Sequence, residues 1–367
     1  MYRKFSSKKV ETCIILYGHK LYGNLKSLYE ELDEIEVEYY FLTFDYKAYK
    51  KLKNNSINVL YGLRVKDMKK VVFSKLIVTD HGLHFLKKLV NEQDNYFFDI
   101  NHGLPFQKWD KKILELQSNF TEVWLFSNFH KDIYVNTFNY KTENIEVTGY
   151  GRLDYLITFN RLENKSEKIQ TLKTKYNLPT NEKTVLYAPT WTHQLKKVKN
   201  DYMQPSNFGF LKDLNEIALA SNFNIIFRPH MNMNIGKKLR RNIGALEKIN
   251  LIPQQNFPEA ENFLIISDLL ITDYSSISFD FLLLDRPVLF LDSKDSFPKS
   301  LYKPEILRFG KLVNQYELRY FINKYLIDTA EYFNDTTHSE FKKLLYDDFD
   351  KISSKNYIKR LQHYLQY

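Results

Sequence analysis

The segment LLITDYSSISFDFLLLD, Leu269–Asp285, decides how the whole sequence is interpreted. Its first residues, Leu269–Thr272, are apolar as in a buried strand, and its last residues continue as an apolar helix. Ser275 and Ser276 stand between them, where a helix N-cap is expected. A helix that begins directly after a strand points free N–H groups and the positive end of its dipole beyond that strand. The segment therefore predicts a phosphate-binding turn with Asp273 at its rim, or else only a capped buried helix.

The same alternation of short apolar runs and helical patterns continues along the chain and indicates an α/β protein with mostly parallel sheets. The expected strands are Glu11–Tyr17, Glu36–Thr43, Ile57–Tyr61, Lys75–Thr79, Tyr96–Ile100, Glu122–Phe126, Ile145–Thr148, Thr184–Ala188, Asn224–Phe227, Leu269–Thr272 and Val288–Leu291. Past Val313 the pattern is helical, which suggests terminal helices that pack back across the first domain. We expect two Rossmann-like domains, at residues 1–160 and 161–367, with an active site in the cleft between them.

The composition of the 367 residues is that of a globular protein with an anionic partner. Apolar residues make up 44% of the chain, and the formal charge is +9. Nine basic residues fall in one stretch in which Asp67 is the only carboxylate: Lys47, Lys50, Lys51, Lys53, Arg64, Lys66, Lys69, Lys70 and Lys75. This stretch is either a solvated helical face or a surface that docks on an anionic membrane.

Several features bear on where the protein works. Cys13 is the only cysteine, so no disulfide forms within the chain and a reducing compartment is expected. The N-terminus has only a short apolar run, and no stretch approaches the length of a membrane span. We therefore expect a cytoplasmic protein, either soluble or peripheral on the inner face of the cell membrane.

His102 is a candidate general base. It lies in the run NHGLP, directly after an expected strand, and Gly103 and Pro105 shape a tight turn there. A histidine at a strand end has a pKa suited to proton transfer, although a lone histidine in a loop is more often without function. The competing histidines are His81 and His84 after another strand, with His19 and His193 as weaker candidates.

Arg228 and His230 follow the expected strand that ends at Phe227, and Pro229 stiffens the turn between them. A fixed cation beside a proton donor suits a developing phosphate charge, although a structural arginine with a surface histidine gives the same pattern. The sequence has no Walker loop and no G-x-G-x-x-G, which argues against ATPases and dinucleotide enzymes. It also has no metal-site spacing of His, Cys and Asp, and no zinc-finger, RRM or KH signature, so neither structural zinc nor nucleic acid is expected.

Five runs taken together resemble the CDP-glycerol glycerophosphotransferase family, which builds teichoic-acid-type polymers. They are NHGLP at Asn101–Pro105, TGYGRLD at Thr148–Asp154, VLYAPTW at Val185–Trp191, FRPH at Phe227–His230 and ITDYSSISFDFLLLDRPVLF at Ile271–Phe290. The runs stand in the family's order, and the last is the most specific. The resemblance implies a GT-B type architecture in which the first domain contacts the acceptor and the second holds the nucleotide.

The resemblance also implies roles for individual residues. His102 is implied as the catalytic base, and His230 as a catalytic group at the donor phosphates. The residues assigned to donor binding are Arg228, Asp273, Ser275, Ser276, Pro189 and Thr190, and those assigned to supporting roles are Gly103, Pro105, Arg152 and Asp154.

The implied reaction is attack by an acceptor hydroxyl on the polyol-bearing phosphorus of CDP-glycerol, or of CDP-ribitol, with release of CMP. The acceptor is an envelope glycan, a lipid-linked molecule or a polyol-phosphate chain, as in the synthesis of teichoic acid or a capsule polysaccharide. No cofactor is expected, and the sequence leaves a divalent cation open. Two alternatives are a GT-B glycosyltransferase that uses a nucleotide sugar and an inactive scaffold that binds a nucleotide.

The sequence departs from the family's usual pattern at four positions. Asn101 stands where an aromatic residue usually precedes the first histidine, and Gly151 stands where the family usually has proline. Leu104 and Phe106 also differ from the more typical run HGTPLK. These departures concern the choice of acceptor more than the donor chemistry.

Overall fold

The computed structural model describes residues 11–80, 86, 95–104, 120–190, 207–230, 233, 235–292, 304–346 and 353–366. The chain divides into two compact units. Unit 1 comprises Met1–Gly103, Trp109–Asp154 and Leu345–Tyr367, and unit 2 comprises Leu104–Lys108 and Tyr155–Leu344. The last residues of the chain thus belong to the same unit as the first, whereas the sequence had grouped all the terminal helices with the second domain.

Unit 1 contains a seven-stranded parallel sheet with the order β3-β2-β1-β4-β5-β6-β7. Its strands are β1 Glu11–Tyr17, β2 Glu38–Thr43, β3 Val59–Tyr61, β4 Ser74–Thr79, β5 Tyr96–Asp99, β6 Glu122–Leu125 and β7 Ile145–Val147. All seven coincide with the expected strands to within one or two residues at each end. The runs are recognisable because a parallel strand covered on both faces is apolar at nearly every position.

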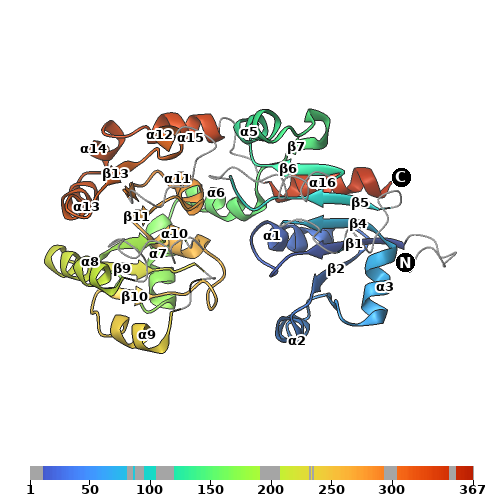
Figure 1. Cartoon of the computed structure of the whole chain (residues 1–367), viewed down its shortest axis with the longest axis horizontal. Helices are drawn as coiled ribbons and strands as arrows, with labels where there is room; N and C mark the ends of the chain where they lie inside the picture. Colours follow the sequence, from blue (N-terminus) through green and yellow to red (C-terminus); the bar gives the residue numbers. More distant parts are fainter. Residues whose placement is uncertain are drawn as a thin grey trace. The chain divides into compact units, whose positions relative to one another are not determined.

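The helices of unit 1 are α1 Gly23–Glu31, α2 Tyr46–Asn54, α3 Val65–Phe73, α5 Asn128–Phe138 and α16 Ser354–Leu365, with short 3₁₀ turns at Leu32–Glu34, Thr142–Asn144 and Gly151–Leu153. α16 packs against α1, which confirms that a C-terminal helix returns to the first sheet (Figure 1). Tyr357 of α16 stacks on Trp124 of β6 with ring centroids 5.3 Å apart, and both side chains are fully buried. The C-terminal helix is therefore part of the core of unit 1.

Unit 2 contains a six-stranded parallel sheet with the order β10-β9-β8-β11-β12-β13. Its strands are β8 Lys183–Tyr187, β9 Phe223–Phe227, β10 Ile249–Leu251, β11 Leu269–Thr272, β12 Val288–Leu291 and β13 Lys311–Val313. The four central strands were expected. The two outer strands, β10 and β13, were not expected, although the equally short strands β3 and β7 of unit 1 were.

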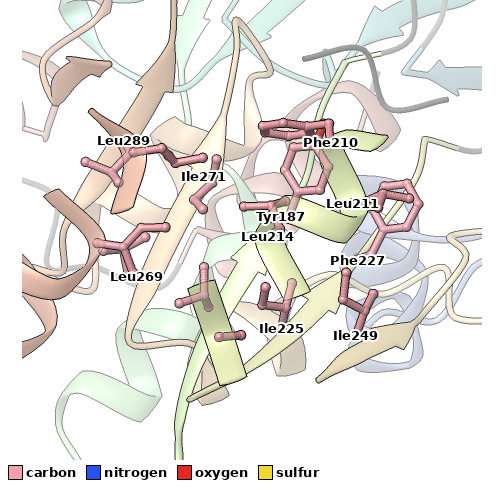
Figure 2. Packing of buried hydrophobic residues seen from close by; sticks show 14 of the residues in the cluster. Tyr187, Phe210, Leu211, Leu214, Ile225, Phe227, Ile249, Leu269, Ile271 and Leu289 are labelled. Carbon is pink, nitrogen blue, oxygen red and sulfur yellow. The ribbon is translucent and has the colours of Figure 1, made fainter. Parts of the chain in front are cut away.

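The first helix of unit 2 begins at Asp154, the residue of unit 1 that directly precedes the long segment of unit 2. The helices of this unit are α6 Asp154–Asn160, α7 Lys165–Lys175, α8 Phe208–Ser221, α9 Lys237–Ile243, α10 Glu261–Ile266, α11 Ile277–Leu282, α12 Pro304–Leu307, α13 Leu318–Ile327, α14 Thr329–Asn334 and α15 His338–Tyr346. Figure 2 shows the core of this unit, where Tyr187 of β8 stacks on Phe227 of β9 with centroids 5.3 Å apart. Phe210 of α8 meets the same tyrosine ring edge-on at 5.6 Å.

The parallel order brings distant segments to one edge of each sheet. In unit 1 the neighbouring strands β4 and β5 end just before Asp80 and Asn101. In unit 2 the adjacent strands β9, β8 and β11 end just before Arg228, Ala188 and Asp273. These are the edges at which open α/β sheets bind ligands. In the described part of the chain, no helix has both the length and the apolar character needed to cross a membrane.

Candidate functional site

The turn after β5 presents His102 to solvent and holds its ring in one orientation. Nδ1 of the imidazole lies 2.9 Å from the carbonyl oxygen of Asp80, at the end of β4. A carbonyl oxygen only accepts hydrogen bonds, so the neutral ring carries its hydrogen on Nδ1 and its lone pair on Nε2. Nε2 is therefore the nitrogen that can take up a proton, as a general base must.

Arg152 supports the same turn from the segment after β7. Its Nη1 donates to the carbonyl of His102 at 2.9 Å, and its guanidinium lies 4.7 Å from the ring centroid of Tyr150. The backbone N–H of Arg152 donates to the side chain of Asn24, whose amide nitrogen donates to the carbonyl of Asn101 at 2.9 Å. The GYGRLD segment and α1 thus fix the backbone on both sides of the histidine.

Asp154 binds the beginning of α16. Its carboxylate accepts the backbone N–H groups of Ser353 at 2.7 Å and Ser354 at 2.8 Å. Burial raises the pKa of Asp154 and these two hydrogen bonds oppose the increase. Of the other residues with an expected supporting role, Gly103 donates its N–H to the side chain of Asn101 at 2.9 Å, whereas Pro105 lies outside the described residues.

In unit 2, Asp273 and Thr190 join the turns after β11 and β8. The carboxylate accepts the backbone N–H of Thr190 at 3.0 Å and its hydroxyl at 2.6 Å. Burial raises the pKa of Asp273, and the hydrogen bonds from Thr190 and from the N–H of Tyr274 lower it. The carboxylate thus holds the turn Ala188–Thr190, which contains the buried Pro189, against the start of the turn Asp273–Ser276.

Neither serine hydroxyl of that turn caps the following helix. Ser276 occupies the N-cap position of α11 in helical conformation and makes no capping hydrogen bond. The carbonyl of Ser275 accepts the N–H of Ser278 at 3.1 Å and its hydroxyl at 2.9 Å. Both serines are half-buried, so the cap alternative does not account for their hydroxyls.

Arg228 is buried directly after β9. Its guanidinium packs 5.1 Å from the ring centroid of Phe263 and donates from Nη2 to the carbonyl of Pro258 at 3.1 Å. Burial lowers its pKa to about 10, so the group remains charged at neutral pH. Its Nη1 is buried without a hydrogen-bond partner among the described residues, a costly state for a cation that a bound anion would relieve. The half-buried His230 follows, and burial lowers its pKa, which favours the neutral ring.

Arg308 is a further cation at this edge, and no sequence motif marked it. It precedes β13 and is half-buried. Burial lowers its pKa, whereas the carboxylates of Asp292 and Asp273 raise it, so the guanidinium lies within electrostatic range of the turn after β11. The sequence offered no signal, because Asp292 and Asp273 follow different strands and only the parallel order brings them together.

His19 follows β1 with an exposed side chain, and His81, His84 and His193 lie outside the described residues. Within the described ranges, no three His, Cys, Asp or Glu side chains come together as a metal site.

Comparison with known proteins identifies a family whose sequences match most of this chain. The sequence profile of the CDP-glycerol:poly(glycerophosphate) glycerophosphotransferases matches residues 2–296. A teichoic acid poly(glycerol phosphate) polymerase of Bacillus spizizenii is 29% identical over 223 residues, which cover 58% of this chain and 50% of that protein. A teichoic acid glycerol-phosphate transferase of Staphylococcus aureus is 28% identical over 162 residues, which cover 44% of this chain and 39% of that protein. The chain thus spans about half or less of the length of these relatives.

Solved structures confirm the fold class. The wall teichoic acid polymerase TagF superposes with a TM-score of 0.74 at 19% identity, over all of this chain and 93% of that one. One TagF variant was soaked with CDPG. The S. aureus MnaA-UDP structure superposes with a TM-score of 0.62 at 15% identity, over 97% of each chain. The expected α/β architecture of GT-B type, with two parallel sheets, is thus confirmed.

Proposed function

Because this chain belongs to the CDP-glycerol:poly(glycerophosphate) glycerophosphotransferase family, we propose that it transfers a polyol phosphate from a CDP-polyol to a hydroxyl group of a cell-envelope polymer and releases CMP. CDP-glycerol is the proposed donor, with CDP-ribitol as its nearest alternative. The observation that carries the proposal is the hydrogen bond between Nδ1 of His102 and the carbonyl of Asp80, since it leaves Nε2 as the basic nitrogen.

In the proposed reaction, Nε2 of His102 removes the proton of the acceptor hydroxyl. The hydroxyl oxygen forms a bond to the polyol-bearing phosphorus, and the bond from that phosphorus to the bridging oxygen of CMP breaks. The electron pair of that bond leaves with CMP. Phosphoryl transfer of this kind depends mainly on positioning and on stabilising charge, so one base and several fixed cations suffice in outline.

We assign the donor to the carboxyl edge of the sheet in unit 2. Arg228 and Arg308 provide permanent positive charge there, and the half-buried serines Ser275 and Ser276 provide hydroxyl donors. His230 is neutral in the unliganded protein, because burial lowers its pKa. A neighbouring diphosphate raises the pKa of a histidine, so we expect His230 to bind the donor and to become protonated as charge develops.

The test is CMP release from CDP-glycerol with a lipid-linked or polyol-phosphate acceptor. We expect His102→Ala to lower turnover by about 10²-fold or more, the usual size of a general-base contribution. His19→Ala is the matched control, since His19 is another exposed histidine after a strand of unit 1, and we expect it to retain most of the activity. If His102→Ala keeps more than about a tenth of wild-type turnover, His102 is not the base. Release of UDP or CDP from a sugar nucleotide would instead identify a glycosyltransferase, and donor binding without turnover would identify a scaffold.

We further propose that the protein works at the anionic inner surface of the cell membrane. The support is the basic stretch of unit 1. Two of its nine cations are only partly exposed, since Lys70 pairs with Glu38 at 2.8 Å and Lys75 donates to the carbonyl of Leu365 at 3.2 Å. The other seven are exposed: Lys47, Lys50, Lys51, Lys53, Arg64, Lys66 and Lys69. Arg64 donates to the hydroxyl of Tyr49 at 2.8 Å but stays exposed.

Exposed apolar side chains lie among these seven cations. Leu63 is 71% exposed and Val65 is 60% exposed, on either side of Arg64 in the segment that leads into α3. Tyr46, which is 51% exposed at the start of α2, has the ammonium of Lys50 4.8 Å from its ring centroid. Cations that surround apolar and aromatic tips match the charged headgroups and the acyl boundary of an anionic bilayer. A solvated helical face would need the charges but not the exposed apolar tips.

A further inference from the structure

We propose that Asn101 is a positioning residue, which holds His102 in the tautomer and orientation that a general base requires. The inference rests on the function proposed above for His102 and extends it to a second residue. The family resemblance does not suggest this role, because Asn101 replaces the usual aromatic residue. It follows from the contacts that this asparagine makes in the turn after β5.

The backbone at Asn101 has a conformation that few residues adopt. Its φ angle is +48°, in the left-handed region, which asparagine and glycine tolerate best. The N–H of Asn101 donates to the carboxylate of Asp99 at 2.9 Å, so the chain turns sharply at the last residue of β5. An aromatic residue would be strained at this φ angle, which gives a reason for asparagine here.

The side chain of Asn101 closes the turn. Its Oδ1 accepts the N–H of His102 at 2.7 Å and the N–H of Gly103 at 2.9 Å. Two N–H groups at one oxygen settle which side-chain atom is oxygen, so Nδ2 points the other way, where it donates to the hydroxyl of Tyr134. The peptide planes on both sides of the histidine are thereby fixed by a single amide group.

The partners of that amide are themselves buried. Asn101 is only 4% exposed, and Tyr134 and Tyr150 are 1% and 2% exposed. The hydroxyl of Tyr150 donates to Oδ1 of Asn101 at 3.3 Å, and the amide nitrogen of Asn24 donates to the carbonyl of Asn101 at 2.9 Å. Water does not reach most of these atoms, so it cannot easily replace a lost amide group.

The consequence concerns the imidazole. Its Nδ1 reaches the carbonyl of Asp80 only while the backbone of His102 keeps its present orientation. Without the amide of Asn101, two N–H groups lose their acceptor and the turn relaxes to find others. The ring then leaves Asp80, and the Nε2–H tautomer, which has no lone pair on Nε2, becomes populated. A shift of about 1 Å at a reacting group can lower a rate by about 10²-fold.

The experiment compares Asn101→Gly with Asn139→Gly in the full-length chain. Glycine keeps the left-handed backbone accessible and removes only the side chain, whereas alanine would add strain. Asn139 is a matched control, since it also has a left-handed φ, +56°, and ends α5 in the same unit with an exposed side chain. Two measurements are made: the tautomer of His102 by ¹⁵N NMR of its imidazole, assigned with His102→Gln, and the steady-state kcat and KM for CDP-glycerol.

We expect the Nδ1–H signature of His102 in the wild type and in Asn139→Gly, and a mixture of tautomers in Asn101→Gly. We also expect Asn101→Gly to lower kcat by about 10- to 100-fold while KM for the donor changes less than about twofold, since Asn101 is buried in unit 1 and the donor is assigned to unit 2. The inference is overturned if Asn101→Gly keeps the Nδ1–H signature, or if its kcat stays within about twofold of wild type. If the wild-type chain releases no CMP, the proposed function fails, and the NMR comparison alone still decides whether Asn101 positions His102.

Discussion

Gly151 stands where the family usually has proline, and one backbone hydrogen bond explains why proline does not fit here. Its N–H donates to the hydroxyl of Tyr357 at 2.9 Å, and that hydroxyl donates in turn to the carbonyl of Gly149 at 3.2 Å. Proline has no N–H to offer. A Cβ at position 151 would also lie 2.8 Å from the Cβ of Ser27, closer than such atoms approach. In this chain the position is therefore adapted to α16.

At this residue scale we predict that Tyr357→Phe destabilises the protein by about 1–3 kcal/mol, the usual result of leaving a buried N–H without its acceptor. Gly151→Pro should destabilise it at least as much, since it removes the donor and adds the clash with Ser27. Equilibrium unfolding in urea measures both. Because Arg152 follows Gly151 and binds the carbonyl of His102, we expect Gly151→Pro also to lower turnover. A Gly151→Pro variant as stable as wild type would contradict this account.

At the scale of elements, α16 is held against the sheet of unit 1 by an ion pair whose carboxylate is buried. Arg360 of α16 donates to the carboxylate of Glu122 of β6 from Nε, at 2.8 and 3.0 Å, and from Nη2. Tyr364 and Trp124 donate to the same carboxylate, which is only 3% exposed. Burial by itself raises the pKa of Glu122. These hydrogen bonds and the charge of Arg360 together lower it by more than burial raises it, so the net shift of the pKa is downward.

The direction of this shift predicts how stability depends on pH. A carboxylate whose pKa is lower in the folded protein stabilises the fold above its ordinary pKa, near 4.5, and loses that effect as the pH falls through the lower folded pKa. We therefore expect wild type to lose more unfolding free energy than Glu122→Gln between about pH 6 and pH 3. At pH 7, Glu122→Gln should be less stable by about 2–3 kcal/mol, less than for a fully buried pair because Arg360 is 32% exposed.

The control for this prediction is Glu146→Gln. Glu146 also pairs with Arg360, at 2.7 Å, but its side chain is 38% exposed. Exposed pairs contribute about 0–1 kcal/mol, so this variant should be close to wild type at every pH. Equal losses in the two variants would mean that the burial of Glu122 has no part in holding α16.

At the scale of the whole molecule, positive charge alone does not identify the membrane surface. α9 of unit 2 is also basic, with Lys237, Lys238 and Arg241 exposed. Unit 2 also has exposed apolar side chains, Tyr316 at 85% and Ile327 at 87%. The surface at α2 and the start of α3 differs because its exposed apolar residues, Leu63 and Val65, alternate in sequence with its cations.

We predict that the protein sediments with vesicles that contain anionic lipid and not with neutral ones. The triple variant Lys47→Gln, Lys50→Gln, Lys51→Gln should weaken this binding on the order of 100-fold, at about 1 kcal/mol for each lysine. The double variant Leu63→Ser, Val65→Ser should weaken it as well, by removing the apolar contacts. The matched controls Lys237→Gln, Lys238→Gln, Arg241→Gln and Tyr316→Ser, Ile327→Ser should bind as wild type does. Equal losses of vesicle binding in the variants and their controls would mean that this surface is not the membrane-binding site.

The sequence by itself determined the fold class, the central strands of both sheets and the motifs at their carboxyl ends. Strands buried on both faces need apolar residues at nearly every position, and a turn beside a ligand needs particular residue types, so both leave a local pattern. The outer strands β10 and β13 of unit 2 were not recognised from the sequence, although the equally short β3 and β7 were. Only the tertiary structure decided which tautomer His102 adopts, since Nδ1 meets the carbonyl of Asp80 through the pairing of β4 with β5. It also decided the contacts of Arg308, Asn101 and α16, because their partners are distant in the chain and meet only when the strands take their parallel order.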